Sequence, residues 1–297
     1  MRIKWIGHAG FIVEADRKCI LIDPWFNPAF LGTWRPQPDN GWLEDEVAAG
    51  EYDYLYISHG HEDHDDKRFQ SRLPYIERIG SSRGGRDGDL AWMRFVDEYR
   101  GDSMLLVDDG ERAVLFANDC NLDRCTWPKV DILACQFSGA SYYPTAYDYP
   151  PNIMRLKIEE ARRRQMDMLV AKVKACGARY YIPCAGPARI EGQPDGPGTP
   201  FPFWDEVSAE FRDRCPDVQV MVPRLGEWLF DDGSAEIVTT FTKGNTTFTM
   251  PRWLWEKIKN EECTWEEALL SFKIKLHRDP DVYDRVMMET LRGRNPE

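Results

Sequence analysis

Three histidines and an aspartate lie within six residues of this 297-residue chain, in the order H-x-H-x-D-H. They are His59, His61, Asp63 and His64, and they follow the apolar run 54–57 almost directly. A strand that ends in such a cluster delivers several ligand atoms to one point, so the motif predicts a metal site. In a tight loop, His59 and His61 would face one metal ion. Asp63 and His64 would then turn toward a second position nearby.

Two metal ions require a bridging carboxylate, and Asp119 is the natural candidate. It follows the run 114–117, a second predicted strand that ends in polar residues. A turn or cap role is the alternative for Asp119. His8 follows Gly7 at the end of the first predicted strand. There it would either complete the shell of the second metal or hydrogen-bond to one of the ligands.

The small number of histidines limits the rest of the ligand set. The chain has five, and none lies between His64 and His277. A further ligand between His64 and Asp119 must therefore be a residue other than histidine. A dinuclear site rich in carboxylate and poor in imidazole is more typical of iron or manganese than of zinc. Because open positions on such iron can take O₂, the ligand count favours an oxygenase over a hydrolase.

Short strands followed by helices must position these residues. Several β-rich runs are separated by turns, and two of them pair around Asp108-Asp109-Gly110. The predicted strands are 4–6, 11–14, 19–22, 52–58, 103–107, 113–117, 131–136, 179–182, 218–222 and 227–230. A helical period over 151–176 ends at Gly177, and helical spacing returns from residue 251.

This order predicts an α/β fold in which two sheets are sandwiched between helices, with the metal site at one sheet edge. We expect a catalytic domain at 1–245 and a C-terminal helical tail at 246–297 that packs on it.

The composition limits the classes of partner that this protein is expected to bind. A net charge of −12 argues against nucleic acid and anionic membranes. The first residues read as a strand and not as a signal peptide, and no apolar run is long enough to span a bilayer. Eight scattered cysteines without a C-x-x-C motif indicate free thiols in a reducing cytoplasm. The composition leaves the oligomeric state open, and a homo-oligomer is compatible with it.

The metal loop, the early Ile22-Asp23-Pro24 segment and the strand that ends at Asp119 together resemble the metallo-β-lactamase superfamily. The resemblance implies an αββα sandwich, and it implies that Asp23 orients a ligand from just outside the metal shell. Two departures bear on the chemistry. The family's third histidine, before Asp119, is absent, and the run Ile182–Pro187 stands where its last histidine is expected.

Longer stretches resemble one branch, the metallo-β-lactamase-like part of the CMP-N-acetylneuraminate hydroxylases. The similarity spans about residues 1–230. The matching runs are His8-Ala9, Ile20–Trp25, Pro28–Phe30, Tyr56–His64, Asp102-Ser103, Asp119-Cys120, Phe137–Ser141, Pro183–Gly186 and Pro223–Gly226. That family also carries a Rieske iron–sulfur domain, whose cluster needs two histidine ligands. This chain has no further histidines for such a cluster. Electrons would therefore come from a separate redox protein. The resemblance favours Glu98 as the third ligand of the first metal and leaves Asp102 outside the shell.

A stand-alone chain of this kind is similar to the diiron monooxygenases of natural-product pathways, such as platensimycin-type diterpenoid hydroxylases. The resemblance implies two Fe ions that use O₂ and an external electron donor. They would hydroxylate a C–H bond of a small molecule, either a natural product or a nucleotide- or thioester-linked substrate. A dinuclear zinc or manganese hydrolase of the lactonase or phosphodiesterase type is the alternative. A metal-stabilised binding protein is a third interpretation.

Aromatic loops are expected to line the substrate pocket. The loop 137–149 is dense in small and aromatic residues, and the Trp-rich loop 25–42 offers a second wall. A surface loop that packs on the tail is the alternative for the first. The predicted pocket residues are Trp25, Phe137, Ser138, Tyr142 and Tyr143.

Overall fold

The computed structural model describes residues 1–15, 17–80, 84–88, 90–96, 101–120, 127–138, 143–186, 188–192, 202–230, 238–271 and 274–291. The chain divides into two compact units, Met1–Leu229 (unit 1) and Phe230–Glu297 (unit 2). All the predicted metal ligands belong to unit 1.

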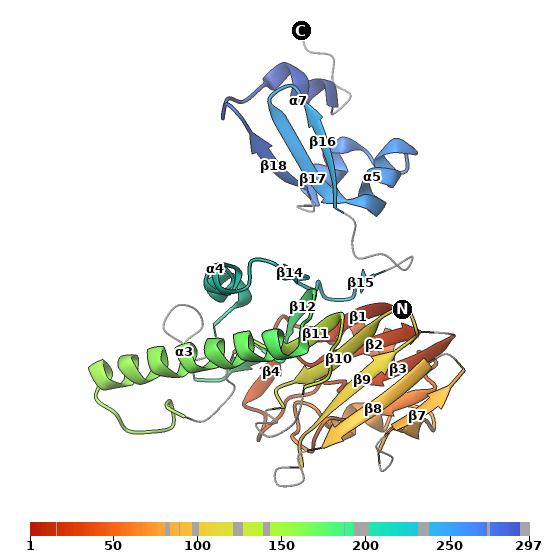
Figure 1. Ribbon diagram of the computed structural model, residues 1–297, viewed down its shortest axis with the longest axis vertical. Helices are drawn as coiled ribbons and strands as arrows, with labels where there is room; N and C mark the ends of the chain where they lie inside the picture. Colours follow the sequence, from red (N-terminus) through yellow and green to blue (C-terminus); the bar gives the residue numbers. More distant parts are fainter. Residues whose placement is uncertain are drawn as a thin grey trace. The chain divides into compact units, whose positions relative to one another are not determined.

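The first sheet of unit 1 has six strands in the order β15-β1-β2-β3-β5-β6. Figure 1 shows β1, β2 and β3 of this sheet side by side. The six strands are β1 (Arg2–Gly7), β2 (Gly10–Ala15), β3 (Lys18–Ile22), β5 (Tyr54–Tyr56), β6 (Glu77–Arg78) and β15 (Trp228–Leu229). Most of their residues are apolar on both faces, which suits a sheet covered on both sides. Because β3 and β5 run parallel, their C-terminal ends meet at one edge of the sheet.

The second sheet has seven strands in the order β14-β12-β11-β10-β9-β8-β7. They are β7 (Gly84–Asp87), β8 (Leu90–Val96), β9 (Ser103–Asp108), β10 (Ala113–Asn118), β11 (Ile132–Gln136), β12 (Tyr180–Cys184) and β14 (Gln219–Val220). The pairs β10–β11 and β11–β12 are parallel. The C-terminal ends of these three strands therefore share an edge, and Asp119 follows β10 at that edge.

Helices cover the outer face of each sheet. Helices α3 (Pro151–Cys176) and α4 (Trp204–Arg214) pack their apolar residues on the second sheet in one core cluster. The short elements η1 (Gly41–Leu43), α1 (Glu44–Ala48) and α2 (Lys67–Gln70) pack on the first sheet in another. Between the sheets, the rings of Phe11 and Phe116 are 5.1 Å apart. The predicted sandwich of two sheets between helices is confirmed.

A small antiparallel ribbon joins two loops of unit 1. Strand β4 (Trp34–Pro36) belongs to the loop after β3, and it pairs with β13 (Ala188–Ile190), which follows β12. Trp25, Ala29 and Ala188 form a buried cluster beneath this ribbon, with Phe30 and Trp34 packed against it. The ribbon therefore holds the loop after β3 in a fixed position.

Unit 2 is a small α/β unit and not the helical tail expected from the sequence. Its strands β16 (Val238–Lys243), β17 (Thr246–Pro251) and β18 (Lys275–Arg278) form an antiparallel sheet, and its helices are α5 (Arg252–Lys259), α6 (Trp265–Leu270) and α7 (Arg285–Leu291).

The expected boundary between residues 245 and 246 falls in the turn of the β16–β17 hairpin, where Gly244 has φ +61°. The alternating Thr and apolar residues of β17 explain the difference, because this pattern favours a strand over a helix. Packing of the C-terminal unit on unit 1 stays a prediction. Among the described helices of the chain, none is long and apolar enough to cross a bilayer.

Candidate metal centre

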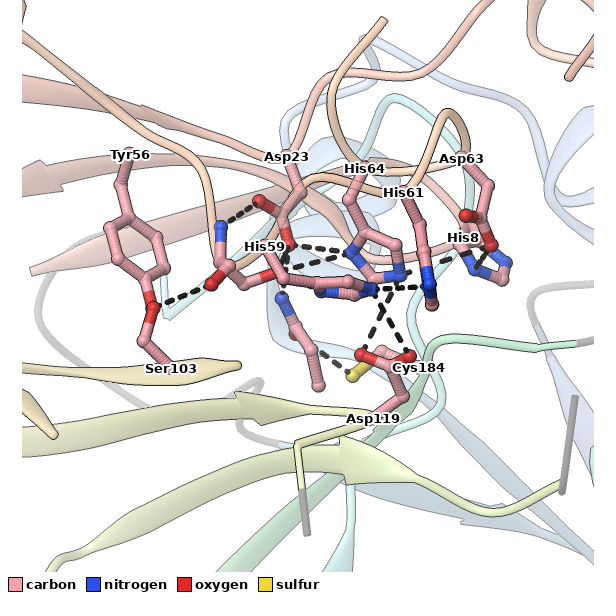
Figure 2. Close-up of polar contacts among 12 residues, drawn as sticks. His8, Asp23, Tyr56, His59, His61, Asp63, His64, Ser103, Asp119 and Cys184 are labelled. Atoms are coloured by element: carbon pink, nitrogen blue, oxygen red, sulfur yellow. Dashed lines mark hydrogen bonds and ion pairs between the residues drawn. The ribbon is translucent and has the colours of Figure 1, made fainter. Parts of the chain in front are cut away.

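Four strand ends, from both sheets of unit 1, deliver the polar residues of the site (Figure 2). His8 follows β1 and Asp23 follows β3, and the H-x-H-x-D-H loop begins at His59, three residues after the end of β5. Asp119 follows β10 and brings a carboxylate from the second sheet. Residues far apart in sequence therefore meet where the two sheets open at one edge.

The backbone around this cluster is strained. Four residues other than glycine have positive φ: His8 (47°), Asp23 (37°), Asn118 (47°) and Ala185 (50°). Each lies just beyond the end of a strand or at its last residue. Such a conformation costs about 1–3 kcal/mol per residue, and it persists where the surrounding structure holds it in place. The concentration of strain at one point is typical of a functional site.

Two groups of ligand atoms lie close enough to hold a metal ion. His8, Asp63 and His64 form one group, and His59, His64 and Asp119 form the other. The ligand atoms within each group are all within 4.8 Å of one another. His64 belongs to both groups, so the two positions are adjacent.

The carboxylate of Asp119 faces two imidazoles of its own group. Its Oδ1 is 3.5 Å from His64 Nε2, and its Oδ2 is 3.8 Å from His59 Nε2. His8 Nε2 is 3.4 Å from Asp63 Oδ2 on the other side of His64. Asp119 and Asp63 therefore both face His64, the histidine that the two groups share.

His59 and His61 point to a common position. The distance from His59 Nε2 to His61 Nδ1 is 2.8 Å (Figure 2). His59 is nearly buried, with 9% of its surface exposed, whereas His61 is exposed. The site is therefore open on the side of His61 and closed around His8, Asp63 and His64.

Asp23 organises the cluster from beneath. It is fully buried and accepts hydrogen bonds from Ser58 N (2.7 Å), Ser58 Oγ (2.6 Å) and Asn118 Nδ2 (2.8 Å). His64 Nδ1 is 2.8 Å from Asp23 Oδ2 and donates to it. This bond fixes the tautomer of His64, so that Nε2 is free to bind a metal.

The flanking hydrogen bonds hold the metal loop to the second sheet. Ser103 Oγ donates to Ser58 O (2.6 Å) and contacts Tyr56 Oη (2.9 Å). Cys184 Sγ donates to Asn118 Oδ1 over 3.6 Å, which supports the side chain that bonds to Asp23. Both sheets therefore set the position of His59 and His64.

Three carboxylates dominate the electrostatics. Burial lowers the pKa of His64, but Asp119, Asp63 and Asp23 outweigh it and raise that pKa to about 10. Burial raises the pKa of Asp63 and of Asp119, yet His64 and the neighbouring imidazoles bring both below their ordinary values. Negative charge therefore accumulates at the point where the ligand atoms converge.

The donor set fits a metal. Among the described residues, His64 Nε2 and Asp119 Oδ1 face each other at 3.5 Å and are buried without a hydrogen-bond partner. His8 Nδ1 and Asp63 Oδ1 are also buried and unpaired there, whereas the atoms that these two residues turn toward each other are Nε2 and Oδ2. Buried polar atoms are normally paired, so two unpaired atoms that face each other require an explanation. Imidazole and carboxylate ligands around a cation provide one, and they suit iron, manganese or zinc.

Most of the predicted ligands are brought together, but one cannot be placed. Glu98 lies outside the described residues. Asp102 is half-buried and belongs to neither ligand group of the described chain. Residues 96 and 103, which flank this segment, are paired across β8 and β9.

The predicted pocket residues have different surroundings. Trp25 is buried, with its ring 5.0 Å from that of His8. Phe137 is buried against Trp204 in the core cluster of the second sheet. Tyr143 stacks edge-on with Tyr147, and Tyr142 lies outside the described residues. The assignment of a pocket to these residues stays a prediction.

Ser138 has surroundings of a different kind. Its Oγ is buried and has no hydrogen-bond partner among the described residues, and a Cβ at Gly186 would lie 2.2 Å from it. Gly186 follows Ala185, whose N–H donates to His8 O at 3.0 Å. Ser138 therefore lies one loop away from the metal cluster.

Sequence reasoning missed the supporting residues Ser58, Asn118, Ser103 and Cys184. Ser58 and Asn118 each precede a predicted ligand directly, and that adjacency was the available signal. Ser103 and Cys184 act through contacts between strands distant in the chain, for which no local pattern exists.

Residues 2–103 match the beta-lactamase superfamily domain. This match and the αββα arrangement identify the fold of unit 1 as the metallo-β-lactamase fold. The matched span carries His8, Asp23 and the H-x-H-x-D-H loop, whereas Asp119 lies beyond it.

Two kinds of relative share sequence with this chain. A putative Rieske 2Fe-2S iron–sulfur protein of Mycobacterium tuberculosis is 34% identical over 227 residues, which cover 63% of this chain and 44% of that protein. The chain thus spans less than half the length of this relative. A UPF0173 metal-dependent hydrolase of Pyrobaculum calidifontis is 45% identical over 65 residues, which are 22% of this chain and 24% of that protein.

Solved structures with a similar architecture include enzymes of two kinds. Igni18, a metallo hydrolase from Ignicoccus hospitalis, has a TM-score of 0.48 at 20% identity and covers 77% of this chain and 97% of its own. CmlA, a diiron β-hydroxylase from Streptomyces venezuelae, has a TM-score of 0.47 at 15% identity and covers 77% and 53%. At these identities and scores, neither structure bears on the activity of this protein.

Proposed function

We propose that this protein is a non-haem diiron monooxygenase that hydroxylates a C–H bond of a small-molecule substrate. The observation that carries the proposal is the pair of adjacent ligand groups that share His64, together with the Asp119 carboxylate, whose two oxygens face different imidazoles. Each group combines imidazole with carboxylate, and the only histidines of the chain outside the two groups are His61 and His277. Such a mixed donor set is typical of dinuclear iron sites.

The residues divide between two iron positions. His59 and His61 would hold the first iron with Glu98 as the third ligand. Asp63, His64 and His8 would hold the second, and Asp119 would bridge the two. Asp23 keeps His64 in the tautomer that presents Nε2, and Asp102 stays outside the ligand shell.

The bound irons would supply O₂ activation and the insertion of one oxygen atom into the substrate. The chain's own residues position and protect this chemistry. His8, Asp63 and His64 are at most 5% exposed, so the second position is shielded from bulk water. The exposed His61 leaves the first position as the side from which substrate would approach.

Monooxygenation requires electrons, and we infer that a separate redox protein supplies them. The shared sequence with a putative Rieske 2Fe-2S protein supports this inference, because its name associates the same kind of chain with an iron–sulfur centre. A second candidate function is hydrolysis by a zinc or manganese pair, which would activate a water molecule. The similarity of a short segment to a metal-dependent hydrolase favours this alternative.

Metal analysis of protein purified without added metal distinguishes the two functions. We expect about two irons per chain and a visible absorption band that bleaches on reduction. Reduced protein should then consume O₂. Two zinc ions per chain, together with ester hydrolysis that does not depend on O₂, would establish the hydrolase instead.

A variant of His8 tests the assignment of the second position. His8→Ala should retain the iron held by His59 and His61 and lose most of the other, so the iron content should fall by about half. His277→Ala is the matched control, because His277 lies on β18 in unit 2. An unchanged iron content in His8→Ala would remove His8 from the ligand set.

A further inference from the structure

The open side of the metal centre is bordered by an apolar loop tip. Phe30 belongs to the loop that follows β3, and its ring centroid is 6.0 Å from that of His61 in an edge-to-face arrangement. The next residue, Leu31, is fully exposed. Exposed apolar side chains beside a functional site often mark a surface that binds a ligand.

The tip is held in an unusual backbone conformation. Phe30 and Leu31 have φ angles of +49° and +62°, and neither is glycine. Branched and bulky residues rarely adopt this conformation, because Cβ crowds the neighbouring carbonyl oxygen. Gly32 follows at φ +81°, so three successive residues turn the chain in the left-handed sense.

Three contacts keep the tip in place relative to the metal loop. The Glu62 carboxylate, between His61 and Asp63, accepts a hydrogen bond from Phe30 N. Ala29 and Trp34 exchange backbone hydrogen bonds at 3.0 and 3.1 Å across the base of the loop. Strand β4, which begins at Trp34, is paired with β13. The metal loop therefore anchors the tip directly, and the ribbon prevents it from folding away.

We propose that Leu31, supported by Phe30, determines specificity by contacting an apolar part of a substrate whose polar end lies at the metal centre. The inference rests on the proposed dinuclear site. The second position is buried, so a ligand would reach the metals past His61 and Phe30, and Leu31 is the next residue of the same loop tip. An exposed leucine held in a strained conformation has no contact within the described chain to justify its position, whereas a bound apolar chain would cover it.

Alkyl hydroxamates test this arrangement, because their polar head binds iron whatever the length of their tail. On the iron-loaded full chain, we expect octanohydroxamate to bind at least ten times more tightly than acetohydroxamate. Each methylene that becomes fully buried contributes a factor of about four, so two are enough. The affinity is read from the visible band of the iron–hydroxamate complex.

Variants of Leu31 test whether this residue causes the gain in hydroxamate affinity. Leu31→Asn removes the apolar surface and keeps a residue that tolerates the left-handed conformation, so the fold should be unaffected. The ratio of the two affinities should fall at least fourfold in this variant and recover in Leu31→Met. It should not change in Leu270→Asn, the same substitution at an exposed leucine of unit 2.

The two proposals fail in different ways. If acetohydroxamate binds but the affinity ratio is equal in wild type and Leu31→Asn, the role of Leu31 is refuted and the metal centre stands. If neither hydroxamate binds the iron-loaded protein, the open dinuclear site is refuted and the role of Leu31 with it.

Discussion

Replacing Asp23 with asparagine should weaken metal binding beyond its effect on folding. The Asp23 carboxylate is fully buried and accepts four hydrogen bonds, two from Ser58, one from Asn118 and one from His64. Asparagine has nearly the same shape but only one acceptor oxygen, so it cannot satisfy all four donors.

The magnitude follows from the two orientations of the new amide. With its oxygen at the Oδ2 position, three bonds persist and the amide N–H opposes Ser58 N–H. With its oxygen at the Oδ1 position, the amide faces the groups that donated to Oδ2, and His64 must change tautomer to accept from it. The first orientation leaves both the Ser58 N–H and the new amide N–H without an acceptor, and each buried donor left unpaired costs about 1–3 kcal/mol of unfolding free energy.

The effect on the metal should be larger than this loss of stability implies. His64 would lose its negatively charged partner and part of its fixed orientation. Loss of such a partner typically weakens metal binding by about 10–100-fold. We expect this decrease for Asp23→Asn in competition titrations against a chelator, carried out where the variant is fully folded.

Asp66→Asn is the matched control. Asp66 is also a buried aspartate near the metal loop, and its carboxylate accepts hydrogen bonds from Phe26, Asn27 and Phe69 instead of from a ligand. It should lose comparable stability in denaturant and keep its metal affinity. Equal affinities in wild type and Asp23→Asn, or an equal loss in both variants, would refute the role assigned to Asp23.

Three further predictions concern protons, ligands and backbone. The pKa of His64 is raised from 6.5 to about 10, so the stability due to its protonation is complete below pH 6.5 and is lost toward pH 10. Metal binding near neutral pH should therefore release about one proton, seen in calorimetry as a dependence on buffer ionisation enthalpy. Glu98→Gln should lower the metal content and Asp102→Asn should not, as measured by elemental analysis; the reverse result would exchange their roles. Gly186→Ala should lower the unfolding free energy by about 1–3 kcal/mol in denaturant, because its Cβ would lie 2.2 Å from Ser138 Oγ at φ +152°; full stability would show that this contact relaxes freely.

Local patterns were sufficient for several parts of the fold. The helical period of 151–176 and Gly177 predicted α3 with the bounds that the structure has, because a long period and a left-handed C-terminal residue are both local signals. The hairpin at Asp108-Asp109-Gly110 also formed as predicted, joining β9 and β10. The strands before the metal loop were found for the same reason.

Other elements have no local signal. Strand β7 (Gly84–Asp87) contains two glycines and two charged residues, and it exists because β8 pairs with it. In unit 2, the helical spacing after residue 251 led to the prediction of a helical tail. Strand β17 forms because it pairs with β16 and β18. Whether such a segment forms a strand depends on its pairing with distant segments, and the β propensity of its own residues does not reveal that pairing.

The same limit applies to the site. His59, His61, Asp63 and His64 are close in sequence, so their spacing alone predicted that they would cluster. His8 and Asp119 were placed only as ends of predicted strands, and their meeting depends on how the two sheets pack. Asn118 and Cys184 were not predicted at all, because a support that crosses between strands has no sequence pattern.

The position of Asp119 at the end of a strand of the second sheet would make the proposed metal pair a cross-link between distant parts of the chain. A metal held by His64 and Asp119 closes a covalent loop of more than fifty residues, which includes all of β6 to β10. Closing a loop of that size is entropically costly while the chain is unfolded, so the centre forms only after both sheets have assembled. Binding to the completed centre then stabilises the assembled sandwich by mass action. Metal uptake during refolding should accordingly lag behind the formation of either sheet. The time of metal binding would then mark the time at which the two sheets of unit 1 have packed together.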